Sequence, residues 1–330
     1  MPTYPGISSE AFKHPLDYQA ETALRSVPGF DLLASNFVEY FHERPWQIYL
    51  LGNGIQVGPR QYSTLYGIFR ECVRDLSLAI EPKLFVTQNP QANSFSLGRD
   101  HPSLVVHSGL LDLLNEAEIR ATIAREIGHI KCDHGVFSQM AMWVMQATQL
   151  LGDVTFGLGN LLSSGLIVAF YEWRRKAELS ADRAVLLVMD DLDLVMRTMM
   201  KVAGGVQKYA HECSLEEVIR QSEEYQELDR DDLNQIYKFF AYNSDRGAFL
   251  SHSFSVERLY YLREWEQSEQ YRQIRQGNYK NATQEGAVNV STADSEDEIE
   301  TLQRQIRDLE EKISRFKGRA ASGRGDRKSQ

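Results

Sequence analysis

The chain has 330 residues, of which 42% are hydrophobic and 25% charged, so it has the composition of a globular protein and is long enough to bury a large core. Acidic residues outnumber Lys and Arg by 46 to 36, and the formal net charge of -10 excludes a surface built to coat nucleic acid. Three widely spaced cysteines exclude a disulfide framework, and a mean hydropathy of -0.40 excludes a polytopic membrane protein.

The pattern of apolar residues predicts an α+β protein. Residues 1–45 are predicted to form a helical lead-in, and the apolar run at 46–51 is predicted to be a buried strand. Apolar residues at helical spacing between 62 and 76 predict an amphipathic helix. Three short strands of a small antiparallel sheet are predicted at 84–87, Ser94–Leu97 and Ser103–His107. From Gly109 onward the chain is helical in character, which is an α+β order and not a βαβ alternation.

Residues 135–171 carry a single charge, Asp153, between two uncharged stretches of 18 residues. Each stretch has the length of a short membrane span, but its glutamine, asparagine and serine residues fit hydrocarbon poorly. We interpret the segment as a helix pair buried in a soluble core, with a hairpin lying in a bilayer surface as the alternative. The N-terminus has no basic stretch followed by an apolar run, so the sequence predicts no signal peptide and a cytoplasmic location.

The C-terminal part is predicted to consist of a polar linker at 279–296, a short coiled-coil helix at 297–317 and a basic, disordered tail at 318–330. The apolar seam of the helix follows heptad spacing at Ile299, Leu302, Ile306, Leu309 and Ile313. So few heptads need a partner helix from a second copy or from another protein, and the alternative is a solvated helix docked on its own domain.

Two fragments point to metallopeptidase chemistry. Residues 125–129 read R-E-I-G-H, where a zincin helix reads H-E-x-x-H. In such a helix two histidines at i and i+4 bind zinc, and the glutamate acts as general base. About fifty residues later, Glu178 and Asp182 are also four positions apart, so both carboxylates lie on one helix face.

With these fragments the sequence resembles the gluzincin metallopeptidases of the HtpX and CAAX-prenyl-endopeptidase family, and most closely the plastoglobule-type members of photosynthetic lineages. The matching stretches are NSFSLG at 93–98, LVVHSGL at 104–110, CDHG at 132–135 and KAELSADR at 176–183. The resemblance covers roughly residues 45 to 265. It implies a mostly helical, zincin-like metallopeptidase domain over residues 46–278 with a small antiparallel sheet, zinc as cofactor and a polypeptide as substrate or partner.

The resemblance also implies roles for individual residues. Glu126 is the general base, His129 and Glu178 are zinc ligands, and Asp182 orients a ligand histidine. Residues Leu104, Val105, Val106 and His107 form the edge strand that pairs with an extended polypeptide. His252 is a histidine on a loop that approaches the metal, with Arg258 behind it, although the family has proline where this chain has Ser253.

Arg125 stands where the family has the first zinc-binding histidine. A guanidinium has five donors, no lone pair to offer and a charge at all physiological pH values, so it cannot bind zinc. We expect Arg125 to face Glu178 and Asp182 and to replace the zinc by an internal cation, which would make the protein a pseudoprotease. Alternatively His129, Glu178 and His252 hold zinc and leave one position for water. Cys132 and His134 are weaker candidate ligands.

Three functions follow from this sequence. The favoured one is a catalytically impaired metallopeptidase without a functional zinc site that binds polypeptide or acts as an assembly or regulatory partner. The first alternative is an active zinc metalloendopeptidase. The second is a membrane-surface adaptor in which residues 135–171 contact lipid and the heptads recruit a partner. No GxGxxG, Walker A or GxSxG motif is present, so nucleotide-binding and serine-hydrolase functions lose their support.

Overall fold

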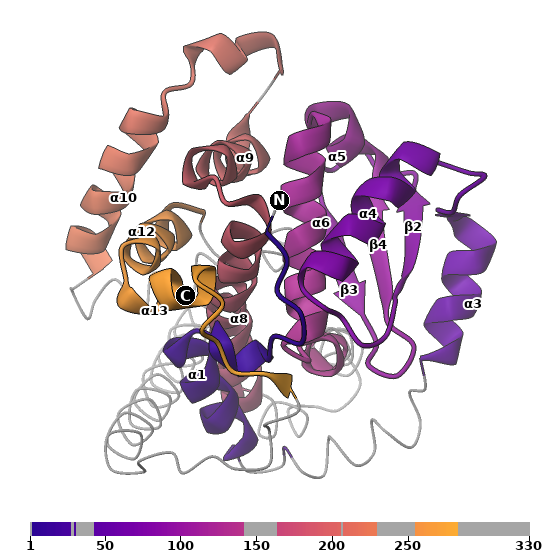
Figure 1. The fold of residues 1–330 in the computed structure, drawn as a ribbon, viewed down its shortest axis with the longest axis horizontal. Coiled ribbons are helices and arrows are strands. Elements are labelled where there is room, and N and C mark those ends of the chain that lie inside the picture. Colours follow the sequence, from indigo (N-terminus) through magenta and orange to yellow (C-terminus); the bar gives the residue numbers. More distant parts are fainter. Residues whose placement is uncertain are drawn as a thin grey trace, which may run out of the picture.

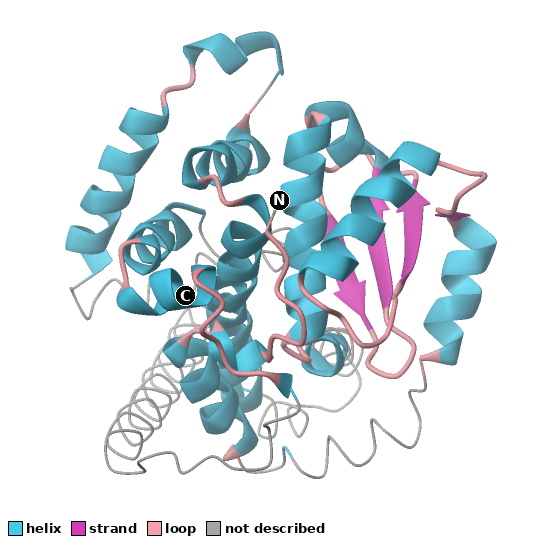
Figure 2. Ribbon diagram, in the orientation of Figure 1, coloured by secondary structure: helices cyan, strands magenta, loops and turns pink. Residues whose placement is uncertain are grey.

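The computed structural model describes residues 2–27, 30, 43–141, 164–205, 207–229 and 255–282. Helices surround a small sheet that lies at one side of the molecule (Figures 1 and 2). The elements in chain order are η1 (Ser9–Ala11), α1 (Pro15–Arg25), α3 (Arg44–Asn53), β1 (Ile55–Gln56), α4 (Ser63–Asp75), β2 (Lys83–Thr87), β3 (Ser94–Leu97), β4 (Ser103–His107), α5 (Ser108–Leu113), α6 (Glu116–Lys131), α8 (Ser164–Met189), α9 (Leu192–Gly204), η3 (Gln207–Glu212), α10 (Leu215–Asp229), α12 (Ser255–Glu266) and α13 (Glu269–Arg275). The predicted α+β fold with a helical majority is confirmed.

The sheet has four strands in the order β1-β2-β4-β3 and is mixed. The three strands predicted between residues 84 and 107 are present, but the prediction of an antiparallel sheet is wrong, because β2 and β4 run parallel. Strand β3 lies at the edge and pairs antiparallel with β4, so the chain returns from it into the middle of the sheet. Every residue of β4 is buried, as an interior strand requires, whereas the serine-rich β3 suits an edge.

The strand predicted at residues 46–51 is wrong, since these residues belong to helix α3. Pro45 lies in the first turn, where its missing N–H is no loss and its fixed φ favours a helix. The helix ends at Gly54, whose backbone N–H donates to the carbonyl of Leu50. Leu50 is buried against Phe85 and Val105 on one face of the sheet.

The other face of the sheet packs against α4 and α6. Leu84, Val86, Leu104 and Val106 point into this core. The helix predicted between residues 62 and 76 is confirmed as α4, which buries Leu65, Phe69 and Cys72. Beyond α6 lies α8, and Figure 1 shows these two helices side by side in the middle of the molecule.

The N-terminal segment is part of the same core. Tyr4 and Phe12 are buried, and Ile7 forms a β-bridge with Asn281 near the end of the described chain. Helix α1 packs on α8. Of the predicted helical lead-in, the structure shows η1 and α1 as helices and residues 2–8 without helix, and both parts pack into the domain.

Several predictions fall on residues outside the described ranges. They include most of the linker, the heptad helix, the basic tail and the middle of the uncharged segment, residues 142–163. Within the described ranges, no helix is both long and apolar enough to cross a membrane.

Candidate functional site

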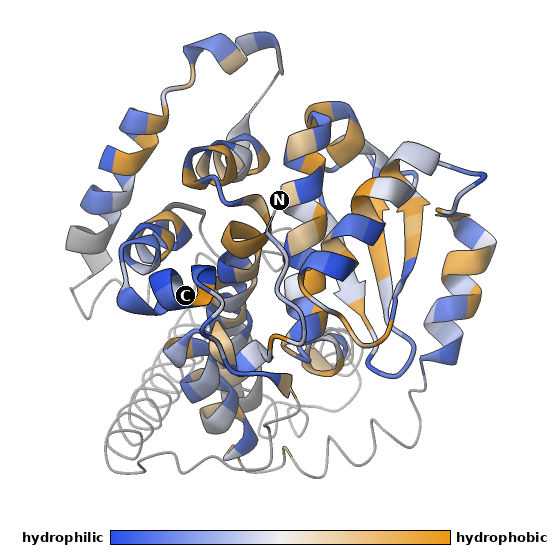
Figure 3. Ribbon diagram, viewed as in Figure 1, coloured by the Kyte–Doolittle hydropathy of each residue, from blue (hydrophilic) through white to orange (hydrophobic). Residues whose placement is uncertain are grey.

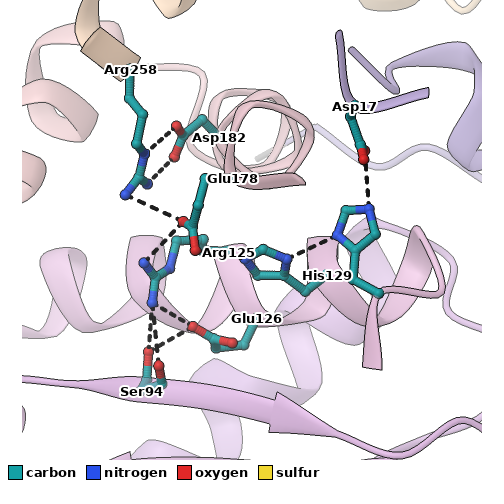
Figure 4. Close-up of polar contacts among 9 residues, drawn as sticks. Asp17, Ser94, Arg125, Glu126, His129, Glu178, Asp182 and Arg258 are labelled. Atoms are coloured by element: carbon teal, nitrogen blue, oxygen red, sulfur yellow. Dashed lines mark hydrogen bonds and ion pairs between the residues drawn. The ribbon is translucent and has the colours of Figure 1, made fainter. Parts of the chain in front are cut away.

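Helices α6 and α8 carry the residues that the sequence analysis singled out. Helix α6 begins with a capping box, in which Asn115 accepts from the backbone N–H of Glu118 and the Glu118 side chain accepts from that of Asn115. The two helices approach closely at Gly128, where a Cβ atom would lie 2.7 Å from the Cβ of Ala184. This contact brings the side chains of residues 125–129 next to Glu178 (Figure 4).

Arg125 lies between two buried carboxylates. Its Nη2 donates to Oε1 of Glu126 at 2.6 Å, and its Nη1 donates to Oε2 of Glu178 at 3.3 Å. Nη2 also lies 3.3 Å from the hydroxyl of Ser94, which itself donates to Oε1 of Glu126 at 2.8 Å. The guanidinium thus occupies the space between the expected general base and an expected ligand.

Asp182 pairs with a different arginine from the one we expected. Arg258, on α12, binds both of its carboxylate oxygens, with Nε to Oδ2 at 2.6 Å. The Nη1 of Arg258 also lies 3.3 Å from Oε2 of Glu178. The expected pairing of Arg125 with Glu178 is present, whereas Asp182 is held by Arg258.

Burial and charge act against each other in this group. Desolvation alone would raise the pKa of Glu178, but Arg125 and Arg258 outweigh it and hold that pKa well below its usual range. The same opposition, with Arg125 as the main cation, lowers the pKa of Glu126. Arg174 is close enough to feel both carboxylates, although burial lowers its pKa overall. The ion-pair cluster contains two arginines and three acidic residues: Arg125, Arg258, Glu126, Glu178 and Asp182.

His129 is the second part of the site. Its Nδ1 lies 2.9 Å from Nδ1 of His134, and Nε2 of His134 lies 3.0 Å from Oδ2 of Asp17 on α1. The carboxylate can only accept, so His134 carries its proton on Nε2, and its Nδ1 accepts from His129. Burial lowers the pKa of His134, in keeping with a neutral ring. With Nδ1 of His129 engaged in these hydrogen bonds, its Nε2 faces Oε1 of Glu178 at 3.5 Å.

Asp17 anchors that chain of hydrogen bonds. It is buried, and its Oδ2 also accepts from the hydroxyl of Ser180 at 2.5 Å. Burial would raise its pKa, but His134, Lys13 and Ser180 together hold the pKa at about 2. The sequence analysis missed Asp17 and Ser180, because Asp17 is 117 positions from His134 and no local pattern links them.

The predicted substrate edge strand is wrong. Leu104, Val105, Val106 and His107 form β4, whose two sides are taken by β2 and β3. The strand beside α6 at the edge of the sheet is β3, which contains Ser94. An extended polypeptide that joins the sheet next to the site would therefore pair with β3.

A cavity of about 40 Å³ lies next to the ion-pair cluster. Arg125, Asp182 and Arg258 form part of its wall. The rest is mostly apolar and includes Leu110, Ala121, Val185, Val195, Met199 and Val202. Its wall and its volume suit a small apolar group.

The described residues do not fit a zinc ion. No group of three His, Cys, Asp or Glu side chains that could hold a metal occurs among them, and a guanidinium lies between Glu126 and Glu178. His129 and Glu178 alone have the placement of ligands, because two donors on a tetrahedral zinc lie about 3.3 Å apart. His252 lies outside the described ranges, and the buried Cys132 has a raised pKa, mainly through burial, that disfavours the thiolate a metal needs.

The helical majority, the small sheet and the pairing of α6 with α8 define a zincin-like metallopeptidase fold. A sequence model of peptidase family M48 matches residues 59–266, well over half of the chain, and the chain belongs to this family.

Individual relatives of the chain agree with this family assignment. The chain is 31% identical over 283 residues to the plastoglobule-localized metallopeptidase 48, chloroplastic, of Arabidopsis thaliana, with 84% of this chain and 79% of the relative covered. A protease HtpX homolog of Dictyoglomus turgidum is 31% identical over 144 residues, or 42% of this chain and 43% of the relative. A protease HtpX homolog of Dictyoglomus thermophilum is 34% identical over 143 residues, which is 41% of this chain and 44% of the relative. The chain thus spans less than half of these two HtpX homologues. No solved structure matched it significantly.

Proposed function

We propose that this member of peptidase family M48 is a pseudoprotease, in which an internal cation replaces zinc and the cleft binds polypeptide without cleaving it. The observation that carries the proposal is the position of Arg125, whose guanidinium bridges Glu126 and Glu178 at 2.6 and 3.3 Å. A metal at the same place would have to displace this buried cation or lie beside it, and like charges repel strongly where water is scarce.

The arrangement changes what Glu126 can do. A general base needs a free carboxylate oxygen directed at a water molecule. Oε1 of Glu126 accepts from both Arg125 and the hydroxyl of Ser94. Both contacts are made by Oε1, and they keep the carboxylate ionised and hold α6 against β3. Without a metal nearby, Glu126 has no metal-bound water to activate, so its role becomes the stabilisation of this contact.

Polypeptide binding needs features that do not depend on metal. The edge strand β3 and the apolar cavity next to Arg125 provide backbone pairing and a site for a small apolar group. A protein that binds without cleaving can act as an assembly or regulatory partner. The same proposal includes the heptad helix. Its apolar seam, which begins at Ile299, would pair with a second copy or with another protein.

The test uses fluorescently labelled, unfolded casein with zinc added in slight excess. We expect casein to bind and to stay intact, with no difference between the protein and its Glu126→Gln variant. Cleavage that Glu126→Gln abolishes would overturn the proposal, and failure to bind casein would overturn its polypeptide part.

The alternative is an active zinc endopeptidase with His129, Glu178 and His252 as ligands. The 3.5 Å separation of Nε2 of His129 and Oε1 of Glu178 favours it, since it is close to the spacing of two ligands on one zinc. The loss of casein cleavage in a His252→Ala variant would distinguish this alternative from a zinc-free protein.

A membrane-surface adaptor is the third candidate. The name of the Arabidopsis relative places that protein in plastoglobules of the chloroplast, whereas this sequence predicts a cytoplasmic location. For this chain we propose peripheral association, with no choice of compartment. The residues first considered for it, 135–171, lie largely outside the described ranges, and a different surface carries the argument below.

A further inference from the structure

Exposed apolar side chains gather on α3 and the residues that follow it. Among the described residues nine large apolar side chains are exposed, and six of them fall between positions 46 and 62. They are Trp46 (37% exposed), Ile48 (61%), Tyr49 (55%), Leu51 (56%), Ile55 (46%) and Tyr62 (45%). Figure 3 shows α3 at the rim of the molecule, with both apolar and polar residues along it. We call residues 44–62 the α3 surface.

Helix α3 turns most of its large apolar side chains away from the core. At 100° per residue, Ile48 lies opposite the buried Leu50, Tyr49 and Leu51 lie on the two flanks, and Trp46 lies closer to the side of Leu50. Exposed apolar side chains that gather in one place mark an interaction site. The side chains of the α3 surface therefore need an apolar environment that the described part of the chain does not supply.

The charge of this stretch differs from that of the whole chain. Residues 44–70 contain three arginines and no Asp or Glu, although acidic residues outnumber basic ones overall by 46 to 36. Arg44 and Arg60 are exposed, while Arg70 pairs with Glu81. Glu43, just before the stretch, is turned to the loop at Asp100 and His101, whose backbone N–H groups donate to it. The α3 surface is thus apolar and positively charged on an acidic protein.

We propose that the α3 surface docks on an anionic lipid surface. Helix α3 has ten residues, about 15 Å, which is too short to span a bilayer but suits a helix lying in the headgroup layer. Tryptophan and tyrosine favour this layer because their rings are apolar and carry one polar atom. Ile48 and Leu51, on the side away from Leu50, enter the acyl boundary, Trp46 and Tyr49 lie at its rim, and Arg44 and Arg60 contact lipid phosphates.

The site of Arg125 takes no part in this docking, so the inference is independent of the pseudoprotease proposal and rests only on the peripheral association proposed above. The acid-free stretch is the reason to prefer lipid to a symmetric contact between two copies, because the α3 surface of a second copy carries the same positive charge and would repel it. A zwitterionic membrane would provide the apolar environment but no partner for the arginines.

The test is flotation of the full chain with vesicles of phosphatidylcholine, with or without phosphatidylglycerol. We expect binding to the anionic vesicles only. The double variant Ile48→Glu, Leu51→Glu should bind at least about tenfold more weakly, since both charges would enter the acyl boundary. Ile80→Glu, a matched change at a side chain that is 49% exposed outside the α3 surface, should bind like the parent. Replacing Arg44 and Arg60 by Gln should weaken binding about fivefold for each arginine.

Brominated lipids provide a second readout, because they quench a tryptophan that enters the acyl region. Quenching should be strong in a Leu51→Trp variant and much weaker in Ile80→Trp, which places the tryptophan outside the α3 surface. Equal flotation of the parent and of the double Glu variant would overturn the proposal, as would equal binding to neutral and anionic vesicles. A dimer that the double variant abolishes, in a protein that does not float, would assign the α3 surface to self-association instead.

Discussion

At position 125 a guanidinium contacts the buried carboxylates of Glu126 and Glu178. Each contact would be weak at the surface, but in the interior the ionised groups depend on one another. Arg258 and Asp182 extend the same dependence to α12. The guanidinium thus makes Glu126 and Glu178 members of one ion-pair cluster.

Replacing Arg125 by alanine should be strongly destabilising. Glu126 and Glu178 would keep their burial and lose their main cation, so we expect the free energy of unfolding to fall by about 3–5 kcal/mol. Chemical denaturation of parent and variant measures the difference. Arg197→Ala removes an exposed ion pair with Asp193 and should cost less than about 1 kcal/mol. An Arg125→Ala variant as stable as Arg197→Ala would show that the buried cation is not needed.

His14 should make stability depend on pH. It is buried beside Tyr261, and burial together with Arg183 and Lys176 lowers its pKa from 6.5 to about 3. The unfolded chain then takes up a proton that the folded chain refuses, so this contribution is complete above pH 6.5 and is lost as the pH falls toward 3. The slope reaches about 1.4 kcal/mol per pH unit.

Asparagine at position 14 is the matched variant. The Nδ1 of His14 accepts from the backbone N–H of Leu16 as the N-cap of α1, and asparagine can keep that hydrogen bond without titrating. Denaturation curves between pH 7 and pH 4 should fall less steeply for His14→Asn than for the parent. Parallel curves would mean that His14 does not remain neutral in the folded protein.

Residues of the site were predictable where they share one helix. Glu126 and His129 follow from helical spacing, as do Glu178 and Asp182. Asp17 could not be found in this way, because it reaches His134 only after α1 packs on α8. The position of Arg258 was correctly expected near the site, but its pairing with Asp182 depends on how α12 packs.

At the scale of elements, the contact between α6 and α8 determines the spacing of the site. Gly128 allows it, since the nearest side-chain atom to a Cβ added there is the Cβ of Ala184 at 2.7 Å. The separation of Arg125 from Glu178 therefore depends on a residue that has no side chain. The sequence did not reveal this role, because a glycine within a helix has several explanations.

Gly128→Ala should push the two helices apart. The methyl group cannot fit without a shift of α6 or α8, and we expect a loss of about 1–3 kcal/mol in the free energy of unfolding. Gly67→Ala is the control, because α4 offers open space at that position and alanine favours a helix by about 1 kcal/mol. If Gly128→Ala is as stable as Gly67→Ala, the helices are not as close as the structure has them.

Strand positions were predictable from short apolar runs between turn signals, but their pairing was not. Neighbouring strands in the sequence favour an antiparallel hairpin, whereas the wholly buried β4 takes the interior place between β2 and β3. The α3 helix was mistaken for a strand because an apolar run of six residues has no period of its own, and Pro45 was the signal for a helix start.

For the whole molecule, the two ends of the described chain hold each other. The backbone N–H of Ser8 donates to the carbonyl of Lys280, and that of Ala282 donates to the carbonyl of Gly6. Ile7 lies between them and is fully buried. Because α1 then positions Asp17, the beginning of the chain takes part in ordering the site.

Ile7→Ala should therefore destabilise the whole domain. We expect a loss of about 2–5 kcal/mol, as for other large-to-small changes in a core. Ile80→Ala, at an exposed isoleucine, should change the free energy of unfolding by less than about 0.5 kcal/mol. Thermal or denaturant unfolding compares the two variants. Equal stability of Ile7→Ala and Ile80→Ala would mean that the N-terminal segment is only loosely attached.

Membership of peptidase family M48 describes the scaffold, and the residues at the site determine what the scaffold does. The docking surface on α3 and the ion-pair cluster of α6 and α8 are separate features of one domain. A protein with both could bind polypeptide at a lipid surface without cutting it.

The most direct test of the pseudoprotease proposal is the zinc content of the purified protein, measured by elemental analysis beside its Arg125→His variant. We predict far less than one zinc per chain in the parent and about one in Arg125→His, which restores two histidines on one helix face next to Glu178. Stoichiometric zinc in the parent would contradict the replacement of the metal by Arg125.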